Sequence, residues 1–349
     1  MNKPYSLSGW FNYASFFGVI PHYNSDKSIV INSFKRKLFV SALCILILCG
    51  YCYSQVRKIQ AGHTVNFVFL TEFSCDLIMT MLCLQNSLKN TFMFEAEWSR
   101  LYNYQVCSGY SKKCHLFILG HAIFFLTFGL EFVGTVTTFS LKFYGPYGFF
   151  VLLYYRVLLT TLLLLNFLNN IINSYKEVTK TILIPAGLME IRRARTTFGK
   201  LNTVMGDINA IFGWDMFFLF LFSGLQILTC FCYSAEYFLD GKYTKIILAG
   251  ILMTVLICLI SLALVSLSCH KVVTNVNEIS SACYKMLEEN HLETDLQNEL
   301  LLLANYVKNE LPEFTAAGFF TINRSTLCSM FSITITYFIV ALQVNNYIK

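Results

Sequence analysis

The sequence predicts an all-α membrane protein, a bundle of seven transmembrane helices. Of its 349 residues, 56% are hydrophobic and 13% are charged, against roughly 45–50% and 25% in soluble domains. The mean hydropathy is +0.56. Apolar runs recur along the whole chain, most of them near the ~20 residues that a helix needs to cross the hydrocarbon. These observations exclude an ordinary soluble domain and indicate one membrane domain.

Seven apolar runs are the candidate spans. Each is expected to be helical, because a backbone in lipid must satisfy its hydrogen bonds internally. In chain order they are 38–53, 64–84, 115–138, 147–168, 215–238, 246–269 and 326–344. The chain then divides into an N-terminal segment (1–37), six membrane helices (38–269), a connecting segment (270–325) and a last helix with a short tail (326–349).

The distribution of Lys and Arg predicts the orientation. Of the 26, 19 lie on the side of the N-terminus and six on the other side, and Arg156 lies inside the fourth span. Cytosolic loops carry the excess of basic residues, so we expect a cytosolic N-terminus and an extracellular C-terminus. This is the reverse of a G-protein-coupled receptor, and neither a DRY-like triplet after the third span nor an NPxxY after the seventh is present.

Two of the predicted cytosolic connections have helical patterns. Segment 177–214 spaces its apolar residues by three and four, and segment 297–310 has a similar run. We expect the fourth, fifth and sixth helices to extend into the cytosol and to pack there with 297–310. The alternative is a set of separate surface helices, which would leave the leucines at 300–303 without burial.

The sequence lacks the motifs of an enzyme. It has no P-loop, G-x-S-x-G or HExxH, so we expect neither catalysis nor a cofactor or metal. Its basic residues are scattered over loops, which argues against nucleic-acid binding. Cys230 and Cys232 are two apart and point to different helix faces, so they are not a redox or metal pair. The rival class is a membrane carrier that handles protons or substrate with Glu72, Asp76 and Arg156.

Two short blocks near the C-terminus carry a family resemblance. Thr336-Tyr337, five apolar residues and Gln343 resemble the TYhhhhhQ signature of the insect gustatory receptor family. The upstream stretch GFFTIN, residues 318–323, resembles that family's second recurring block. The topology extends the resemblance over the whole chain. Val344 departs from the pattern, because the family usually has Phe there.

The resemblance implies a taste receptor of the plasma membrane that acts as a ligand-gated, non-selective cation channel. Related receptors are tetramers, and this chain would form a homotetramer or a heteromer with related receptors. The last helix of each subunit would line the central pore, and the cytosolic bundle would anchor the subunits. The outer half of the other helices would bind a small-molecule tastant.

The last span has residues that suit a pore. Its 19 residues give a helix of about 28 Å, which just crosses the hydrocarbon. Ser332, Thr336 and Gln343 lie at offsets of 4 and 7, on one helix face. Val344 follows at the outer end, where an apolar ring could gate by dewetting. The alternative is that these polar groups bond neighbouring helices. The predicted pore and gate residues are Ser332, Thr336, Tyr337, Val340, Gln343 and Val344.

Ionisable residues inside the spans are the candidates for ligand binding, because intramembrane charge is costly and normally faces protein or water. One interpretation is a hydrated pocket open to the outside. The other is a buried pair between Arg156 and the carboxylate of Glu72 or Asp76. His121, nearer the cytosol, is expected to be a packing residue. The candidate ligand-binding residues are Glu72, Asp76, Glu131, Tyr154, Tyr155, Arg156, Tyr233 and Tyr237.

The composition favours one class of tastant. With 33 Phe and 20 Tyr, a pocket would have aromatic walls that suit flat plant secondary (bitter) compounds through ring stacking. Sugar-sensing members often carry an acid directly after the signature tyrosine, where this chain has Phe338. We therefore favour a bitter-type receptor, with a sugar- or fructose-type channel as the alternative.

Overall fold

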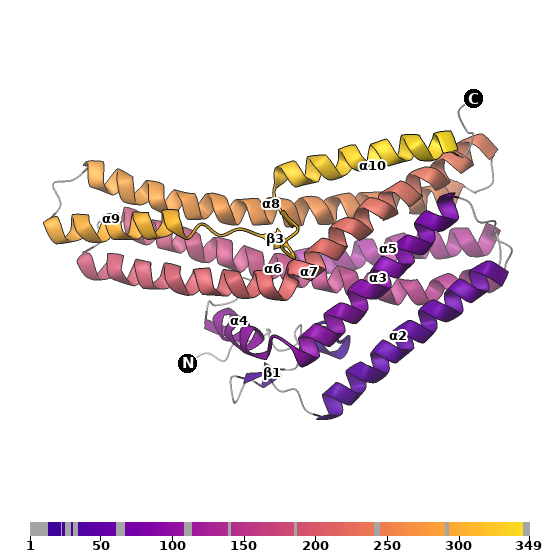
Figure 1. The fold of residues 1–349 in the computed structure, drawn as a ribbon, viewed down its shortest axis with the longest axis horizontal. Coiled ribbons are helices and arrows are strands. Elements are labelled where there is room, and N and C mark those ends of the chain that lie inside the picture. The colour runs from indigo at the N-terminus through magenta and orange to yellow at the C-terminus, as the bar shows by residue number, and fades with distance from the viewer. Residues whose placement is uncertain are drawn as a thin grey trace.

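The computed structural model describes residues 13–21, 23–24, 29–30, 34–60, 67–107, 114–138, 141–184, 187–240, 245–289 and 293–344. Three long helices are its spine (Figure 1): α6 (Leu141–Leu183), α7 (Leu188–Asp240) and α8 (Lys245–Glu289). They have 43, 53 and 45 residues. At 1.5 Å per residue each is about 65–80 Å long, twice the hydrocarbon thickness or more. Each must therefore extend well beyond the membrane.

Four further helices lie beside one end of the spine (Figure 1): α2 (Phe34–Gln60), α3 (Phe67–Phe92), α5 (Cys114–Thr138) and α10 (Arg324–Val344). The predicted spans lie within these seven helices, apart from 64–66, which are outside the described residues. Six of the seven, all but α3, are long and apolar enough to cross a membrane over their described lengths. α3 packs against α2, α6 and α7, so the acidic residues on it have protein neighbours.

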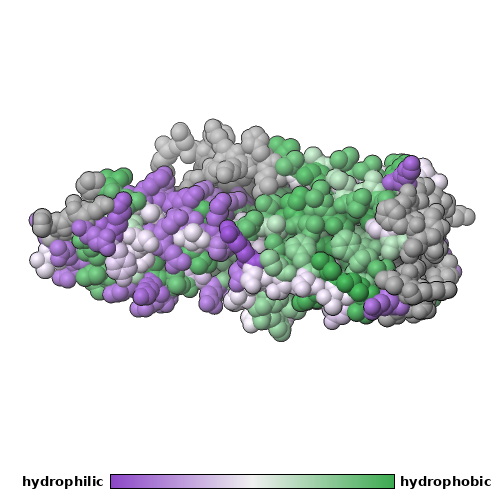
Figure 2. All heavy atoms as spheres, turned by 90° about the horizontal axis from the view of Figure 1, so that it is seen from above, coloured by the Kyte–Doolittle hydropathy of each residue, from purple (hydrophilic) through white to green (hydrophobic). Residues whose placement is uncertain are grey.

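The other end of the spine is a polar bundle. α6 ends before residues 184–187, α7 begins after them, and α9 (Thr294–Asn309) packs against α7 and α8. Leu300 and Leu303 are buried there while Leu301 and Leu302 are exposed. Figure 2 shows hydrophilic residues over this end and a hydrophobic surface over the other half. Such a division is expected of a bundle that lies half in lipid.

The structure also has elements that the sequence analysis did not predict. α4 (Glu95–Cys107) lies beside α7 and buries Trp98 completely. Two small hairpins pair β1 (Tyr23–Asn24) with β2 (Ile29–Val30) and β3 (Thr315–Ala316) with β4 (Phe320–Thr321). Each of these elements is short and has little hydrophobic periodicity, so its sequence pattern does not predict it.

The β3–β4 hairpin positions the start of α10. Its turn needs a left-handed backbone at Ala317 (φ 52°) and Gly318 (φ 81°), a conformation that glycine adopts without strain. Asn323 then caps α10, since its Oδ1 accepts a hydrogen bond of 3.0 Å from the backbone nitrogen of Thr326. The C-terminal block that carries the family resemblance therefore has a structural role in beginning the last helix.

Candidate functional site

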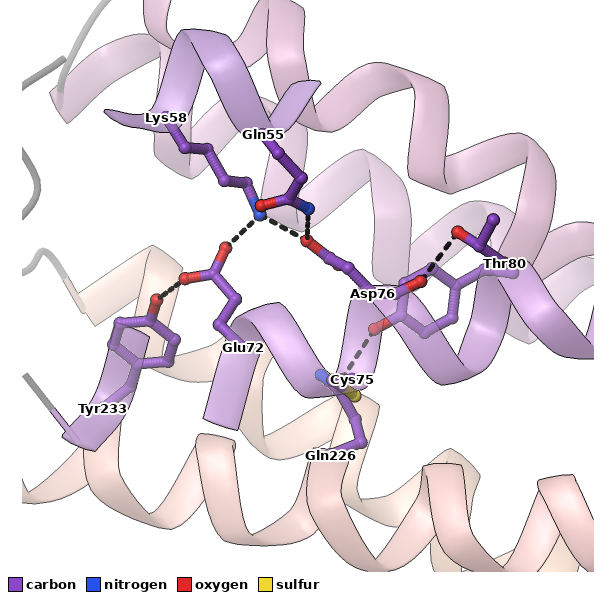
Figure 3. Close-up of polar contacts among 9 residues, drawn as sticks. Gln55, Lys58, Glu72, Cys75, Asp76, Thr80, Gln226 and Tyr233 are labelled. Carbon is purple, nitrogen blue, oxygen red and sulfur yellow. Dashed lines mark hydrogen bonds and ion pairs between the residues drawn. The ribbon is translucent and has the colours of Figure 1, made fainter. Parts of the chain in front are cut away.

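A buried charged cluster joins α2, α3 and α7 (Figure 3). The Lys58 ammonium lies 2.5 Å from a Glu72 oxygen and 2.7 Å from an Asp76 oxygen. Gln55 Nε2 donates to the same Asp76 oxygen at 2.9 Å. Tyr233, from α7, donates to the other Glu72 oxygen at 2.5 Å. Both predicted carboxylates thus have a cation and a neutral donor, and the cluster fastens three helices together.

The cation is Lys58 and not Arg156, so of the two interpretations the one that pairs Arg156 with Glu72 or Asp76 does not hold. The Arg156 guanidinium instead donates to Ser87 Oγ and, at 3.4 Å, to the carbonyls of Gly18 and Cys83. Ser87 is eleven residues after Asp76 on α3, or about 16 Å along the helix. Arg156 therefore cannot reach the carboxylates.

Lys58 itself escaped the sequence analysis. Lys58 follows the first apolar run (38–53), so the sequence alone places it with the six basic residues on the extracellular side. The structure shows that α2 continues to Gln60 and turns Lys58 inward, leaving its side chain 3% exposed. The signal that could have found it is the helical spacing of Gln55 and Lys58, which places both on one face.

Tyr154 and Tyr155 are neighbours in the chain but face different groups. The Tyr154 hydroxyl donates to Gln226 Oε1 at 2.8 Å, and Cys75 Sγ donates to the same oxygen at 2.9 Å. The Tyr155 hydroxyl bonds His121 Nε2 at 2.8 Å. Successive helix residues point about 100° apart, so one helix serves both sites. Gln226 was missed, although a glutamine inside an apolar run is itself a signal.

His121 is a packing residue, as predicted. Its Nδ1 lies 2.8 Å from the Phe117 carbonyl, and its Nε2 is the nitrogen that bonds Tyr155. Tyr155 also contacts the Tyr13 hydroxyl, and its ring packs edge-on against Phe17, 5.3 Å between centroids. Residues 13–17 of the N-terminal segment thus pack into the bundle beside Tyr155.

Glu131 lies apart from the Lys58 cluster, where α5 and α8 meet. Its Oε1 accepts a hydrogen bond of 2.6 Å from Thr254 Oγ1. The helices approach closely, because a Cβ added at Gly250 would lie 2.8 Å from Glu131 Cγ. The side chain of Tyr237 lies outside the described residues. The predicted ligand-binding residues are therefore not one cluster but several neighbouring groups in the bundle.

One side of α10 packs against α7, and the opposite side of α10 is exposed. Thr334 and Ala341 are buried against the bundle, while the predicted pore stripe of Ser332, Thr336 and Gln343 is exposed. At 100° per residue the stripe points about 180° away from the buried side. Thr336 Oγ1 donates to the Ser332 carbonyl at 2.9 Å, so its hydroxyl bonds its own helix rather than a neighbouring one.

The remaining predicted pore residues are exposed but lie beside the stripe: at 100° per residue, Val340 is about 60° and Tyr337 about 120° from its centre. Tyr337 is 56% exposed and Val340 is 41% exposed. Val344 is the last residue of α10, and its side chain lies outside the described residues. A single copy of the chain therefore presents an apolar helix with one polar stripe along its uncovered side.

Comparisons with known proteins agree with this architecture. Residues 7–345 match the family model described as 7tm chemosensory receptor. None of the curated proteins matches the chain. Among solved structures, the chain is similar to the insect olfactory receptor OR5 from Machilis hrabei, with a TM-score of 0.66 and 17% identity over 97% of this chain and 98% of that chain. The same receptor in complex with eugenol gives the same values. At this identity the likeness shows a shared fold.

Proposed function

Since this chain belongs to the 7tm chemosensory receptor family, we propose that it is a taste receptor acting as a ligand-gated, non-selective cation channel. The family match and the membrane-length helices identify a multi-pass membrane receptor rather than an enzyme. They agree with the resemblance found in residues 318–343. The channel, its ligand and its assembly go beyond that match and rest on the arguments that follow.

The observation that carries the proposal is the uncovered polar stripe of α10. Ser332, Thr336 and Gln343 are exposed on the side opposite to α7. In a lone subunit the stripe would face lipid, where polar groups are unfavourable. A ring of four such helices instead places the stripe around a water-filled path without fixed charge, which suits cations of several kinds. The assembly is a homotetramer or a heteromer with related receptors.

The charge count and the distribution of polar surface support the proposed orientation. With 19 of the Lys and Arg residues on the side of the N-terminus, the N-terminus is cytosolic and the C-terminus extracellular, at the plasma membrane. The polar end in Figure 2 is then the cytosolic part of α6, α7 and α8, together with α9. In this arrangement segments 177–214 and 270–325 anchor the subunits to one another.

The ligand site lies in the outer half of the bundle, among α3, α5, α6, α7 and α8. Phe128 and Phe222 each lie 5.3 Å from the Tyr154 ring, centroid to centroid, and such walls favour an aromatic tastant. The structurally similar OR5 has been solved with eugenol, an aromatic compound. A bitter plant compound fits these walls better than a sugar or fructose, which would require a denser set of polar groups.

The carrier alternative is weakened by the charged cluster. A carrier would need Glu72 and Asp76 to exchange protons or substrate, yet both are already held by the ammonium of Lys58, at 2.5 and 2.7 Å. Groups engaged in this way are suited to holding helices together rather than to transport.

The test is expression of the full chain alone, followed by calcium imaging with a panel of sugars and plant secondary compounds. A channel gives ligand-evoked unitary currents that reverse near zero in mixed cations, and four chains per particle in detergent. Saturable flux without unitary currents would identify a carrier. Particles of one or two chains would exclude a pore shared by four subunits.

A further inference from the structure

Glu131 is the intramembrane acid for which the described part of the fold supplies no cation partner. Lys58 is an ion-pair partner of both acids of the charged cluster, Glu72 and Asp76, and Lys89 lies 2.5 Å from Asp215. Glu131 has a hydrogen bond from the neutral hydroxyl of Thr254. Over the described residues, no Lys, Arg or His nitrogen lies within ion-pairing distance of it. A carboxylate in such surroundings is costly unless a cation joins it.

The carboxyl group faces the interior of the bundle. Phe128 and Glu131 come four and seven residues after Phe124, so all three lie on one face of α5. That face packs on α6, because the Phe128 ring lies 5.3 Å from the Tyr154 ring. Glu131 also lies close enough to Tyr154, and to Cys258 on α8, for its charge to act on both side chains. The acid therefore ends an aromatic stripe inside the bundle.

The surroundings of Glu131 fix its position. Thr254 donates to one carboxyl oxygen at 2.6 Å. The second oxygen accepts no hydrogen bond from the described residues and can therefore accept one from another donor. Gly250 allows the close approach, since a side chain there would begin 2.8 Å from Glu131 Cγ and would displace the acid. Thr254 is thus a positioning residue for the carboxyl group.

We propose that Glu131 binds the ammonium group of a protonated amine, whose apolar body packs on the rings of Phe128 and Tyr154. A carboxylate supplies the opposite charge, and aromatic faces attract a cation while also packing on hydrocarbon. The amine enters protonated and pairs with the ionised carboxylate, and no covalent bond changes. The inference rests on the proposed ligand-gated function and names the chemical class of the ligand.

The test compares 4-phenylbutylamine with its neutral counterpart 4-phenylbutan-1-ol, by thermal stabilisation of the purified full chain. The amine should bind the parent protein at least about tenfold more tightly, as expected for a charge-assisted hydrogen bond. Glu131→Gln keeps the size of the side chain and an oxygen for Thr254 but removes the charge. It should weaken amine binding by about tenfold to a hundredfold and leave the alcohol unchanged. The matched control is Glu177→Gln, at an exposed acid that pairs with Lys180 at 2.9 Å, and it should change neither affinity.

The outcomes separate this inference from the channel itself. Equal binding of amine and alcohol to the parent protein, or no stabilisation by the amine, would overturn the role of Glu131. That comparison needs no variant, so it decides the question even if Glu131→Gln fails to fold. Amine binding that depends on Glu131 but evokes no current would support the inference and count against the channel. Currents evoked equally by the amine and the alcohol would support the channel and count against the role of Glu131.

Discussion

Replacing Lys58 with methionine should strongly destabilise the bundle. Methionine keeps much of the apolar stem of lysine and removes the ammonium group. Glu72 would keep its bond from Tyr233, and Asp76 would keep its bond from Gln55. The two carboxylates would nevertheless face each other without a cation. The variant therefore tests whether the charged cluster holds α2, α3 and α7 together.

The magnitude follows from burial. The side chains of Lys58, Glu72 and Asp76 are 3%, 16% and 11% exposed. Removing one partner of a buried pair costs about 3–5 kcal/mol, because the other charge is left uncompensated. The pair between Lys180 and Glu177 has a similar length, 2.9 Å, but its side chains are 67% and 71% exposed. Such a surface pair is worth about 1 kcal/mol or less.

The assay is thermal unfolding of the purified chain in detergent, with Lys180→Met as the control. Lys58→Met should lower the melting temperature clearly more than Lys180→Met does. Adding Glu72→Gln and Asp76→Asn to Lys58→Met should recover much of the loss, because no uncompensated charge remains. If Lys58→Met and Lys180→Met melt alike, the cluster does not stabilise the bundle and the reasoning is refuted.

Four further predictions concern α5, the pore helix and the topology. Gly134→Ala should lower the free energy of unfolding by about 1–3 kcal/mol, because the added Cβ would lie 3.1 Å from a backbone nitrogen of α8. In the same unfolding assay Gly129→Ala should be neutral or stabilising by up to about 1 kcal/mol, because no atom of the described residues lies within 4 Å of its added Cβ. Gln343→Ala should alter ion permeability or gating at normal surface expression, and unchanged currents would remove Gln343 from the pore. Val344→Phe should lower the current without ligand, since a larger apolar ring seals better, and an equal or greater leak would place the constriction elsewhere. A tag after Lys349 should be stained on intact cells, whereas staining only after permeabilisation would reverse the topology.

The helices were predictable because lipid imposes a simple rule. An apolar run of about 20 residues must be helical where it crosses the hydrocarbon, and every predicted span lies in a helix wherever the structure describes it. The helical spacing in 177–214 and 297–310 likewise indicated helices that reach beyond the membrane. The chemosensory receptor family was recognisable from a few residues, Thr336-Tyr337 and Gln343 with the block at 318–323, and the family match over residues 7–345 confirms it at that level.

The partners of the ionisable residues were not predictable from the sequence. Arg156, Glu72 and Asp76 are all intramembrane charges, and nothing in their spacing says which cation pairs with which acid. Depth along the helix decides it, since Asp76 and Ser87 are about 16 Å apart on α3 and Arg156 lies beside Ser87. The true partner, Lys58, comes from an extension of α2 beyond its apolar run.

The sequence by itself determined that this chain is an all-α membrane receptor of the chemosensory family, because composition, apolar run length and a short terminal signature are local properties. Only the tertiary structure decided how the polar groups divide. It placed Glu72 and Asp76 around Lys58, and it placed Tyr154 beside Gln226. It also placed Glu131 beside Thr254, with no cation from the described part of the chain. The rotation and depth of each helix determine these contacts, and both come from packing between segments far apart in the chain, which no local pattern encodes.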